Sequence, residues 1–268
     1  STENSVSRAS GYPVRVVRKE KNQGLAAARN TAIVESSGDF IASCDSDVSL
    51  EPGWLENIMS HFLDINVAGA GGKLLERNKE RLPDRWRSLN MIQHWGDKKV
   101  VNPRFLYGAN TVFRKDVFTA VGKYNELYRT NKEDSDLCLR VKKAGKKIIY
   151  EPAAIAEHIR TDTIQSILNT YYGWKRYGYM DSNSFYRDFN KLWGKINFSV
   201  NICYDMILSD ISQELLDLLY PAVLIMFRFP LRDIKECETN KNELTISTVL
   251  IKNILSENEY NEYQSTIR

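Results

Sequence analysis

One short apolar segment that ends in two carboxylates constrains the fold of this chain more than any other feature. Residues 40–44 are apolar or small, and turn-forming pairs at 37–38 and 52–53 bound the segment. An apolar run of about four to eight residues between turn formers predicts a strand buried on both faces. Asp45 and Asp47 follow it directly, at the strand end where an open α/β sheet holds its ligand. The two acids either bind a divalent cation through their oxygen atoms or form a solvated turn.

The neighbouring segments alternate between strand-like and helix-like patterns. Residues 14–17 and 67–75 are apolar strand candidates, whereas residues 25–34 and 52–62 are alanine-rich or have helically spaced apolar side chains. Because strands joined through helices usually pair in parallel, this order predicts the α/β class, with a mostly parallel sheet and crossover helices. The glycines within residues 67–75 also predict a strand that other backbone approaches closely.

The chain changes character near residue 160. Beyond that point, three segments are helix-like and rich in Tyr, Leu and Ile: residues 163–179, 199–229 and 243–255. We therefore expect an α/β domain over residues 1–160 and a helical region over residues 161–268.

Residues 76–104 interrupt the regular pattern of the first part. They combine many Lys and Arg residues with Trp86 and Trp95. A connection of this length is uncommon in a compact domain unless it has a function. It is therefore either a binding loop or lid, or a solvated excursion with ordinary surface charge.

Composition and charge exclude several classes of protein. A formal net charge of +3 is too small to indicate a nucleic-acid partner. The four cysteines are far apart, without a C-x-x-C pair, which argues against a zinc site or a disulfide framework and favours a reducing compartment. The first ten residues are polar, unlike a signal peptide. The longest apolar run, residues 218–227, is about half of what a membrane-spanning helix needs. We expect a cytoplasmic protein, either free or at the inner face of the membrane.

Two further groups of ionisable residues lie at the ends of predicted elements. Glu133 and Asp134 open a predicted helix, and His158 follows a strand-like segment. Each has a plain structural explanation: the acids suit the positive end of a helix dipole, and a single histidine is often structural. Together with Asp45 and Asp47, however, they would supply a metal pair, a further ligand and a spare carboxylate base.

Four stretches of the chain resemble family 2 of the glycosyltransferases, which have the GT-A fold. The similarity covers roughly residues 1–175. Its motifs are residues 22–30 (NQGLAAARN), 45–47 (DSD), 108–114 (GANTVFR) and 133–137 (EDSDL). The resemblance implies a GT-A-type, Rossmann-like, mixed and mostly parallel sheet flanked by helices, with a C-terminal helical appendage outside the similarity.

The resemblance also implies a donor site for a nucleotide-diphosphate sugar. Asp45 would face the ribose and the water shell of the metal, and Asp47 would bind Mn²⁺ or Mg²⁺ directly, with His158 close to the metal or the diphosphate. The residues expected to bind the nucleotide-sugar are Asn22, Gly24, Arg29, Asp45 and Asn110, and those expected at the metal are Asp45, Asp47 and His158.

For the reaction itself, the resemblance implies that Asp134 is the catalytic base and that Glu133 positions the acceptor. A single displacement with one base inverts the anomeric centre. The acceptor would be a hydroxyl of a glycan or of a lipid-linked molecule, as in polysaccharide biosynthesis. A non-catalytic relative that binds nucleotide-sugars or glycans is the alternative. A third hypothesis is a nucleotidyltransferase. Such an enzyme would usually carry a Gly-rich phosphate loop near its start, and residues 1–30 contain none.

Two expectations concern the ends of the chain. Residues 1–5 resemble the end of a family segment that normally follows two strands and a helix, so we expect either a trimmed chain or an N-terminally truncated protein. The helical region, with an aromatic and basic segment at 171–179 and an apolar one at 215–229, would contact a membrane surface, pack on the core or form a homo-oligomer interface.

Overall fold

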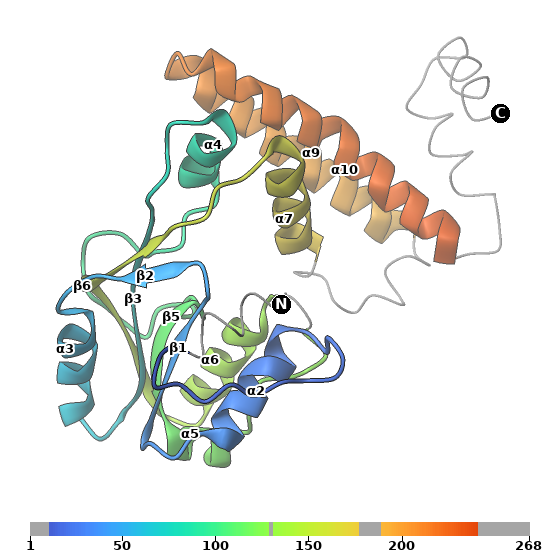
Figure 1. The fold of residues 1–268 in the computed structure, drawn as a ribbon. Coiled ribbons are helices and arrows are strands. Elements are labelled where there is room, and N and C mark those ends of the chain that lie inside the picture. Colours follow the sequence, from blue (N-terminus) through green and yellow to red (C-terminus); the bar gives the residue numbers. More distant parts are fainter. Residues whose placement is uncertain (1–10, 129–130, 177–188, 241–268) are drawn as a thin grey trace, which may run out of the picture. The chain divides into compact units, whose positions relative to one another are not determined.

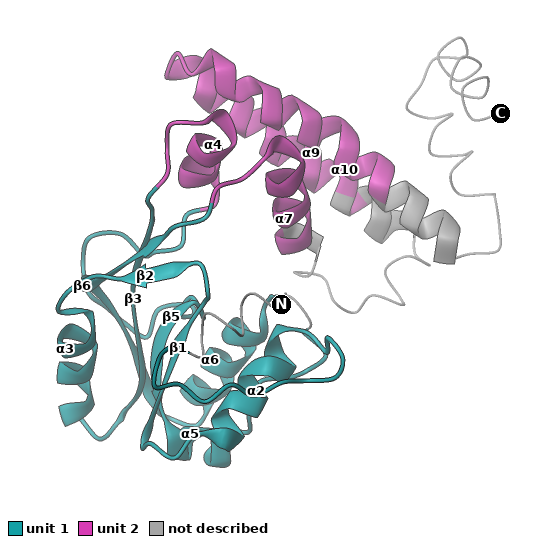
Figure 2. Cartoon of the chain, viewed as in Figure 1, with its two compact units in different colours: residues 1–77, 92–160 teal, residues 78–91, 161–268 magenta. Residues whose placement is uncertain are grey.

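The computed structural model describes residues 11–128, 131–176 and 189–240, which form two compact units. Residues 1–77 and 92–160 make an α/β unit, and residues 78–91 and 161–268 make a helical unit (Figures 1 and 2). The helical unit therefore includes a short piece of the chain from within the α/β part. The predicted pair of domains divided at residue 160 stays a prediction, since compactness alone does not show that either part folds independently.

A six-stranded sheet is the centre of the α/β unit (Figure 1). Its spatial order is β1-β5-β3-β6-β2, and β4 pairs with β6. The β3–β6 pair is parallel and the other four pairs are antiparallel. The strands are β1 (Phe40–Cys44), β2 (Val48–Leu50), β3 (Val67–Glu76), β4 (Val100–Val101), β5 (Asn110–Arg114) and β6 (Lys147–His158).

The predicted class, an α/β fold with a mixed sheet, flanking helices and a helical C-terminal part, is confirmed. Strands β1, β3 and β6 run in the same direction, as expected of strands joined through helices. The described sheet is less parallel than predicted because β5 lies between β1 and β3 and runs against both. Sequence order could not reveal this insertion, because β5 is far from both partners along the chain.

Two predictions about individual strands were wrong. Strand β1 is not buried on both faces, because its residues range from intermediate to exposed and β5 is its one neighbour among the described strands. Residues 14–17 form no strand, and Val14, Val16 and Val17 are exposed. No described strand offers this segment the ladder hydrogen bonds that a strand requires.

Helices cover both faces of the sheet (Figure 1). Helix α3 (Trp54–Met59) and the 3₁₀ turn η1 (Ser60–Leu63) pack on one face, where Trp54, Ile58 and Phe62 are buried. Helices α2 (Leu25–Glu35), α5 (Lys115–Ala120) and α6 (Glu133–Lys143) pack on the other. The central strand β3 is consequently buried along most of its length.

The glycines of β3 allow the close backbone approach that the sequence predicted. A Cβ atom on Gly72 would overlap the carbonyl oxygen of Ala154 on β6. At the same place the β3–β6 register shifts between Gly72 and Lys73, as at a β-bulge. Beyond this irregularity the two strands pair again, and His158 ends up opposite Glu76.

The helical unit consists of amphipathic helices around its own apolar cluster. The predicted helix over residues 199–229 is interrupted, because Glu214 adopts a left-handed conformation (φ 58°) and a 3₁₀ turn follows it. The predicted helix over residues 243–255 lies outside the described residues. The helices are α4 (Leu82–Asn90), α7 (Ile164–Arg176), α9 (Phe189–Ser212) and α10 (Leu219–Asn240), with η3 (Leu216–Leu218) before α10.

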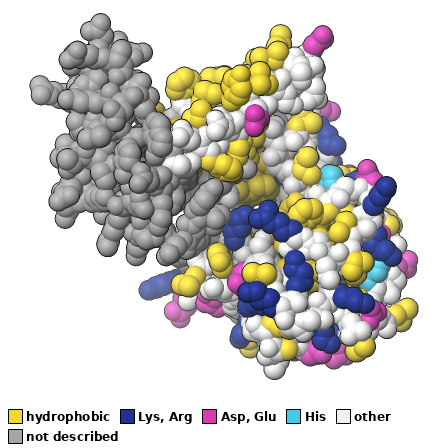
Figure 3. Space-filling view, turned by 180° about the vertical axis from the view of Figure 1, so that it is seen from behind, with side chains coloured by type: hydrophobic (Ala, Val, Ile, Leu, Met, Phe, Trp, Pro, Cys, Tyr) yellow, Lys and Arg dark blue, Asp and Glu magenta, His cyan; other side chains and the backbone are white. Residues whose placement is uncertain are grey.

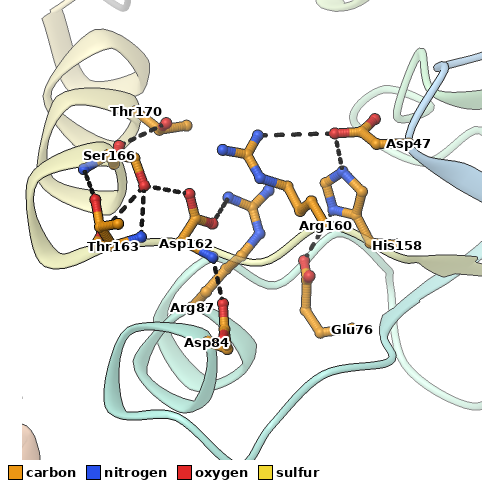
Figure 4. Close-up of polar contacts among 10 residues, drawn as sticks. All are labelled: Asp47, Glu76, Asp84, Arg87, His158, Arg160, Asp162, Thr163, Ser166 and Thr170. Carbon is orange, nitrogen blue, oxygen red and sulfur yellow. Dashed lines mark hydrogen bonds and ion pairs between the residues drawn. The ribbon is translucent and has the colours of Figure 1, made fainter.

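Residues 76–104 are not one solvated excursion, because they are divided between the two units; a role as a binding loop or lid stays a prediction. Trp86, on α4, is completely buried in the cluster of the helical unit, whereas Trp95 packs against the core of the α/β unit. Within the helical unit, buried Arg87 and Asp162 form an ion pair at 3.3 Å, and Asp84 accepts a hydrogen bond from the Asp162 backbone (Figure 4). These contacts join α4 to the segment before α7.

The described surface of the helical unit exposes several large apolar side chains. Hydrophobic groups gather over the helices in the upper part of the view in Figure 3. On α10, Tyr220, Phe227 and Leu231 are each more than half exposed. No helix in the described part of the chain is both long and apolar enough to cross a membrane.

Candidate functional site

The carboxyl ends of β1, β3 and β6 meet at one edge of the sheet. These strands run in the same direction, so their last residues lie at the same edge. Asp45 follows β1, Glu76 ends β3 and His158 ends β6. Three independent strands thus deliver ionisable side chains to one place, as expected of a ligand site in an α/β sheet.

His158 lies between two carboxylates at this edge (Figure 4). Its Nε2 atom is 3.2 Å from Asp47 Oδ2, and its Nδ1 atom is 3.1 Å from Glu76 Oε1. The imidazole is buried, whereas Asp47 is about one-third exposed. A carboxylate on one ring nitrogen fixes the orientation of the ring and leaves the other nitrogen available to a ligand. The guanidinium of Arg160 lies 3.8 Å from the same Asp47 oxygen (Figure 4).

Asp45 points to a different partner from Asp47. Its Oδ1 atom is 3.1 Å from Nη2 of Arg29 on α2, and Nη1 of the same guanidinium is 2.5 Å from Glu133 Oε1 on α6. The Arg29 side chain is only 10% exposed. Arg29 therefore joins the acid at the end of β1 to the acid at the start of α6.

Gly108 makes room for the Arg29 guanidinium. A Cβ atom at this position would lie 2.5 Å from Nη1 of Arg29, which is closer than atoms in contact can come. The ring of Tyr124 lies 5.6 Å from the guanidinium carbon, within the range of a cation–π contact. The arginine is therefore enclosed by backbone, an aromatic ring and two acids.

Asp134 is held beside this arginine by backbone N–H groups. Its Oδ2 atom accepts a hydrogen bond from Gly108 N–H at 3.1 Å, and its Oδ1 atom accepts one from Ser135 N–H at 2.6 Å. Lys132, the residue directly before α6, has a left-handed backbone (φ 75°), a conformation that often marks functional sites. Glu133 and Asp134 consequently occupy the first turn of α6, where the helix dipole favours negative charge.

The environment of Glu133 changes its acidity. Burial and, after it, the charge of Asp134 raise the pKa of Glu133, and Arg29 lowers it; the net result is a pKa of about 7. Its Oε2 atom is buried and has no hydrogen-bond partner among the described residues. Glu133 therefore presents an unused acceptor beside Asp134.

Two of the other predicted nucleotide-binding residues, Asn22 and Gly24, lie apart from these acids. Asn22 and Gly24 line a groove of about 860 Å³ with basic residues of the segment 15–21, and none of the four site carboxylates is among its described lining residues. Asn110 is completely buried, and its Oδ1 atom accepts the Trp54 indole N–H at 2.5 Å. Contact of these three residues with a nucleotide stays a prediction.

Sequence reasoning missed several residues of the site. Glu76 was recognisable in principle, since it directly follows the predicted strand at 67–75. Arg160 follows His158 by two positions but carried no signal of its own. The enclosure of Arg29 by Gly108 and Tyr124 depends on contacts between distant segments, which no local pattern indicates.

The side chains at this edge of the sheet fit a divalent cation in part. The described residues contain no group of three or more His, Cys, Asp or Glu side chains arranged around one metal position. Asp47 and His158, however, lie in contact, and Glu76 orients the imidazole. Two protein ligands suffice where a substrate diphosphate and water supply the other oxygen atoms. In the present geometry Asp45 is paired with Arg29 instead, so Asp47 and His158 are the residues that would hold the ion.

Comparison with known proteins adds to this geometry. The chain is 32% identical over 151 residues to a pre-mycofactocin glycosyltransferase of Mycobacterium tuberculosis (54% of this chain, 32% of the relative). It is 27% identical over 181 residues to an N-acetylglucosaminyltransferase of Azorhizobium caulinodans (62% and 45%). The chain thus spans less than half the length of either relative.

A solved structure of a mannosyltransferase from Pyrobaculum calidifontis, in complex with GDP-Man and Mn²⁺, is similar with a TM-score of 0.47 at 14% identity (100% of this chain, 68% of that chain). A similarity this low adds nothing to the sequence match. The model of glycosyl transferase family 2 matches residues 1–122, which contain the acids after β1, Arg29 and Gly108. Residues 1–122 of this chain are thus similar in sequence to glycosyl transferase family 2.

Proposed function

We propose that this protein transfers a sugar from a nucleotide-diphosphate sugar to an acceptor hydroxyl, with inversion at the anomeric carbon. One observation carries the proposal. Within a chain that matches the family, Arg29 and Gly108 connect Asp45, which follows β1, to Asp134 at the start of α6. This arrangement supports a donor site that lies next to a base for the acceptor.

In this proposal, Asp47 and His158 hold Mn²⁺ or Mg²⁺, and Arg29 and Asp45 lie on the donor side. The ion would bind the diphosphate and stabilise the negative charge on the leaving nucleotide. Glu76 keeps the His158 ring in place through its contact with Nδ1. The nearby Arg160 adds a positive charge at the same edge.

Asp134 takes the proton of the acceptor hydroxyl as that oxygen attacks the anomeric carbon. A new carbon–oxygen bond forms, the bond to the diphosphate breaks, and its electrons leave with the nucleotide. Hydrogen bonds from Gly108 and Ser135 fix the Asp134 carboxylate, as geometry requires of a general base. In this proposal Glu133, the direct neighbour of Asp134, would help to position the acceptor.

The alternative is a non-catalytic relative that binds a nucleotide-sugar or a glycan. The presence of the motif acids and the hydrogen bonds that hold Asp134 favour catalysis. A cytoplasmic location, a glycan or lipid-linked acceptor, and a role of the exposed α10 face at a membrane or between copies of the chain belong to the same proposal.

A donor-hydrolysis screen tests the function. UDP-, GDP- and dTDP-sugars are incubated with the protein and Mn²⁺, and nucleotide release is measured. We expect turnover of one donor class, and we expect Asp134→Asn to bind that donor normally but to lose transfer. Asp136→Asn is the matched control, since Asp136 lies in the same turn but pairs with Arg140. Donor binding without any turnover in the unmodified protein would support the non-catalytic alternative.

A further inference from the structure

Three aromatic side chains form a compact cluster in the α/β unit. The ring centroids are 5.3 Å apart for Trp95 and Phe105, 5.0 Å for Phe105 and Tyr107, and 6.0 Å for Trp95 and Tyr107. All three residues are partly exposed. Trp95 and Phe105 rest on the apolar core, so the cluster has a supported side and an accessible side.

The segment that carries Phe105 and Tyr107 leads directly to Asp134. Residues 103–108 run antiparallel to α6, and their contacts on the helix lie one turn apart, on one face. The contacts are Lys142 Nζ to the carbonyl oxygens of Pro103 and Arg104 (2.9 Å each), Leu106 N–H to Cys138 Sγ (3.4 Å) and Gly108 N–H to Asp134 Oδ2 (3.1 Å).

Burial alternates along this segment. Leu106 and Gly108 are buried against the helix, whereas Phe105 and Tyr107 are partly exposed. Tyr107 directly precedes Gly108, whose N–H binds Asp134. Burial and, after it, the charge of Asp134 raise the pKa of Tyr107 to about 12, so the Tyr107 hydroxyl lies near that carboxylate. We therefore expect a molecule whose hydroxyl reaches Asp134 to lie near the Tyr107 side chain.

The Trp95 ring is fixed by a hydrogen bond. Its indole N–H is bonded to the Phe105 carbonyl at 2.8 Å, which holds the ring before any ligand binds and reduces the entropy cost of binding. Fixed, partly exposed aromatic faces match the apolar C–H face of a sugar ring, and the hydroxyls at the rim of such a ring supply the group that the proposed base requires.

We propose that Trp95, Phe105 and Tyr107 form the acceptor subsite and that the acceptor presents a sugar ring to them. This inference rests on the proposed function, since it takes Asp134 as the base. It narrows the acceptor to a saccharide, either free or at the end of a longer glycan.

The first test separates transfer to the acceptor from hydrolysis of the donor. With the donor found in the screen and glucose, N-acetylglucosamine, galactose and mannose as acceptors, we expect Tyr107→Leu to lower the transfer-to-hydrolysis ratio about tenfold, the loss of about 1.4 kcal/mol that one aromatic contact supplies. Tyr107→Phe keeps the ring and should restore the ratio. The control, Tyr204→Leu, changes an exposed ring of the helical unit. An unchanged ratio in Tyr107→Leu would overturn the proposal.

The second test needs no turnover. The indole N–H signal of Trp95, identified among the five tryptophans by its loss in Trp95→Phe, is followed by NMR while methyl glycosides of the same four sugars are added. We expect at least one glycoside to shift this signal in the unmodified protein and not in Tyr107→Leu. If the donor is hydrolysed but no glycoside moves the signal, the subsite is refuted and the function stands. If glycosides move it but no donor is hydrolysed, the subsite stands and the function is refuted.

Discussion

Gly108→Ala tests the contact on which the proposed site depends. The added Cβ would lie 2.5 Å from Nη1 and 3.0 Å from Cζ of Arg29, so the guanidinium must move away from Glu133. Overpacking of this kind costs about 1–3 kcal/mol, and loss of a partner from a buried ion pair costs about 3–5 kcal/mol. The contact with Asp45 adds little, since that carboxylate is partly exposed. Because the arginine side chain is flexible, we expect a loss of about 2 kcal/mol in the free energy of unfolding.

A double-mutant cycle measured by urea unfolding identifies the cause. In an Arg29→Ala background the added methyl group meets no guanidinium, so Gly108→Ala should then cost less than about 0.5 kcal/mol. Gly38→Ala is the matched control, because its Cβ would meet its nearest neighbour at an ordinary 3.5 Å. If Gly108→Ala is equally costly with and without Arg29, the two residues are not coupled and the reasoning fails.

Three further predictions concern the other buried polar groups. Glu76→Gln should weaken the affinity for Mn²⁺ about 10- to 100-fold, because the orienting partner of His158 is changed; unchanged affinity in a calorimetric titration would contradict the metal assignment. The pKa of Glu133 is about 7 in the folded protein, compared with an ordinary value of about 4.5. The free energy of unfolding therefore decreases as the pH rises from the lower value through the higher one. Glu133→Gln should therefore flatten the dependence of unfolding free energy on pH between those values, and an unaltered slope would count against the rise. Arg87→Leu removes the guanidinium that pairs with buried Asp162 and should cost about 3–5 kcal/mol in urea unfolding. The change of exposed Arg81 to Leu should cost little, and equal effects would contradict the role of the Arg87 pair.

Much of the local structure was predictable because it depends on short segments. The apolar run before Asp45, the glycines of β3 and the helical spacing of α6 and α7 each carry their own signal. The α/β class followed from the alternation of these segments. The acids Asp45, Asp47, Glu133 and Asp134 could likewise be selected, because each stands at the end of an element, where a sheet or helix presents its ligands.

Predictions failed where a residue's environment depends on which segments become neighbours. Because β5 lies between β1 and β3, the sheet is less parallel than predicted. Strand β1 has no second neighbour among the described strands and is therefore partly exposed. Trp86 and Trp95 are nine positions apart in the sequence but belong to the cores of different units. Neither outcome has a signature within the segment itself.

The sequence alone determined the strand that ends in Asp45 and Asp47, and the acids that begin α6. Only the tertiary structure decided how these acids are paired. Arg29 and Glu133 are 104 positions apart, yet their contact of 2.5 Å links Asp45 to the first turn of α6, which carries the proposed base. Asp47 contacts His158 instead. The physical reason is that hydrophobic periodicity specifies an element and its buried face, whereas an ion pair requires two particular surfaces to meet. Which surfaces meet is set by the packing of the whole unit.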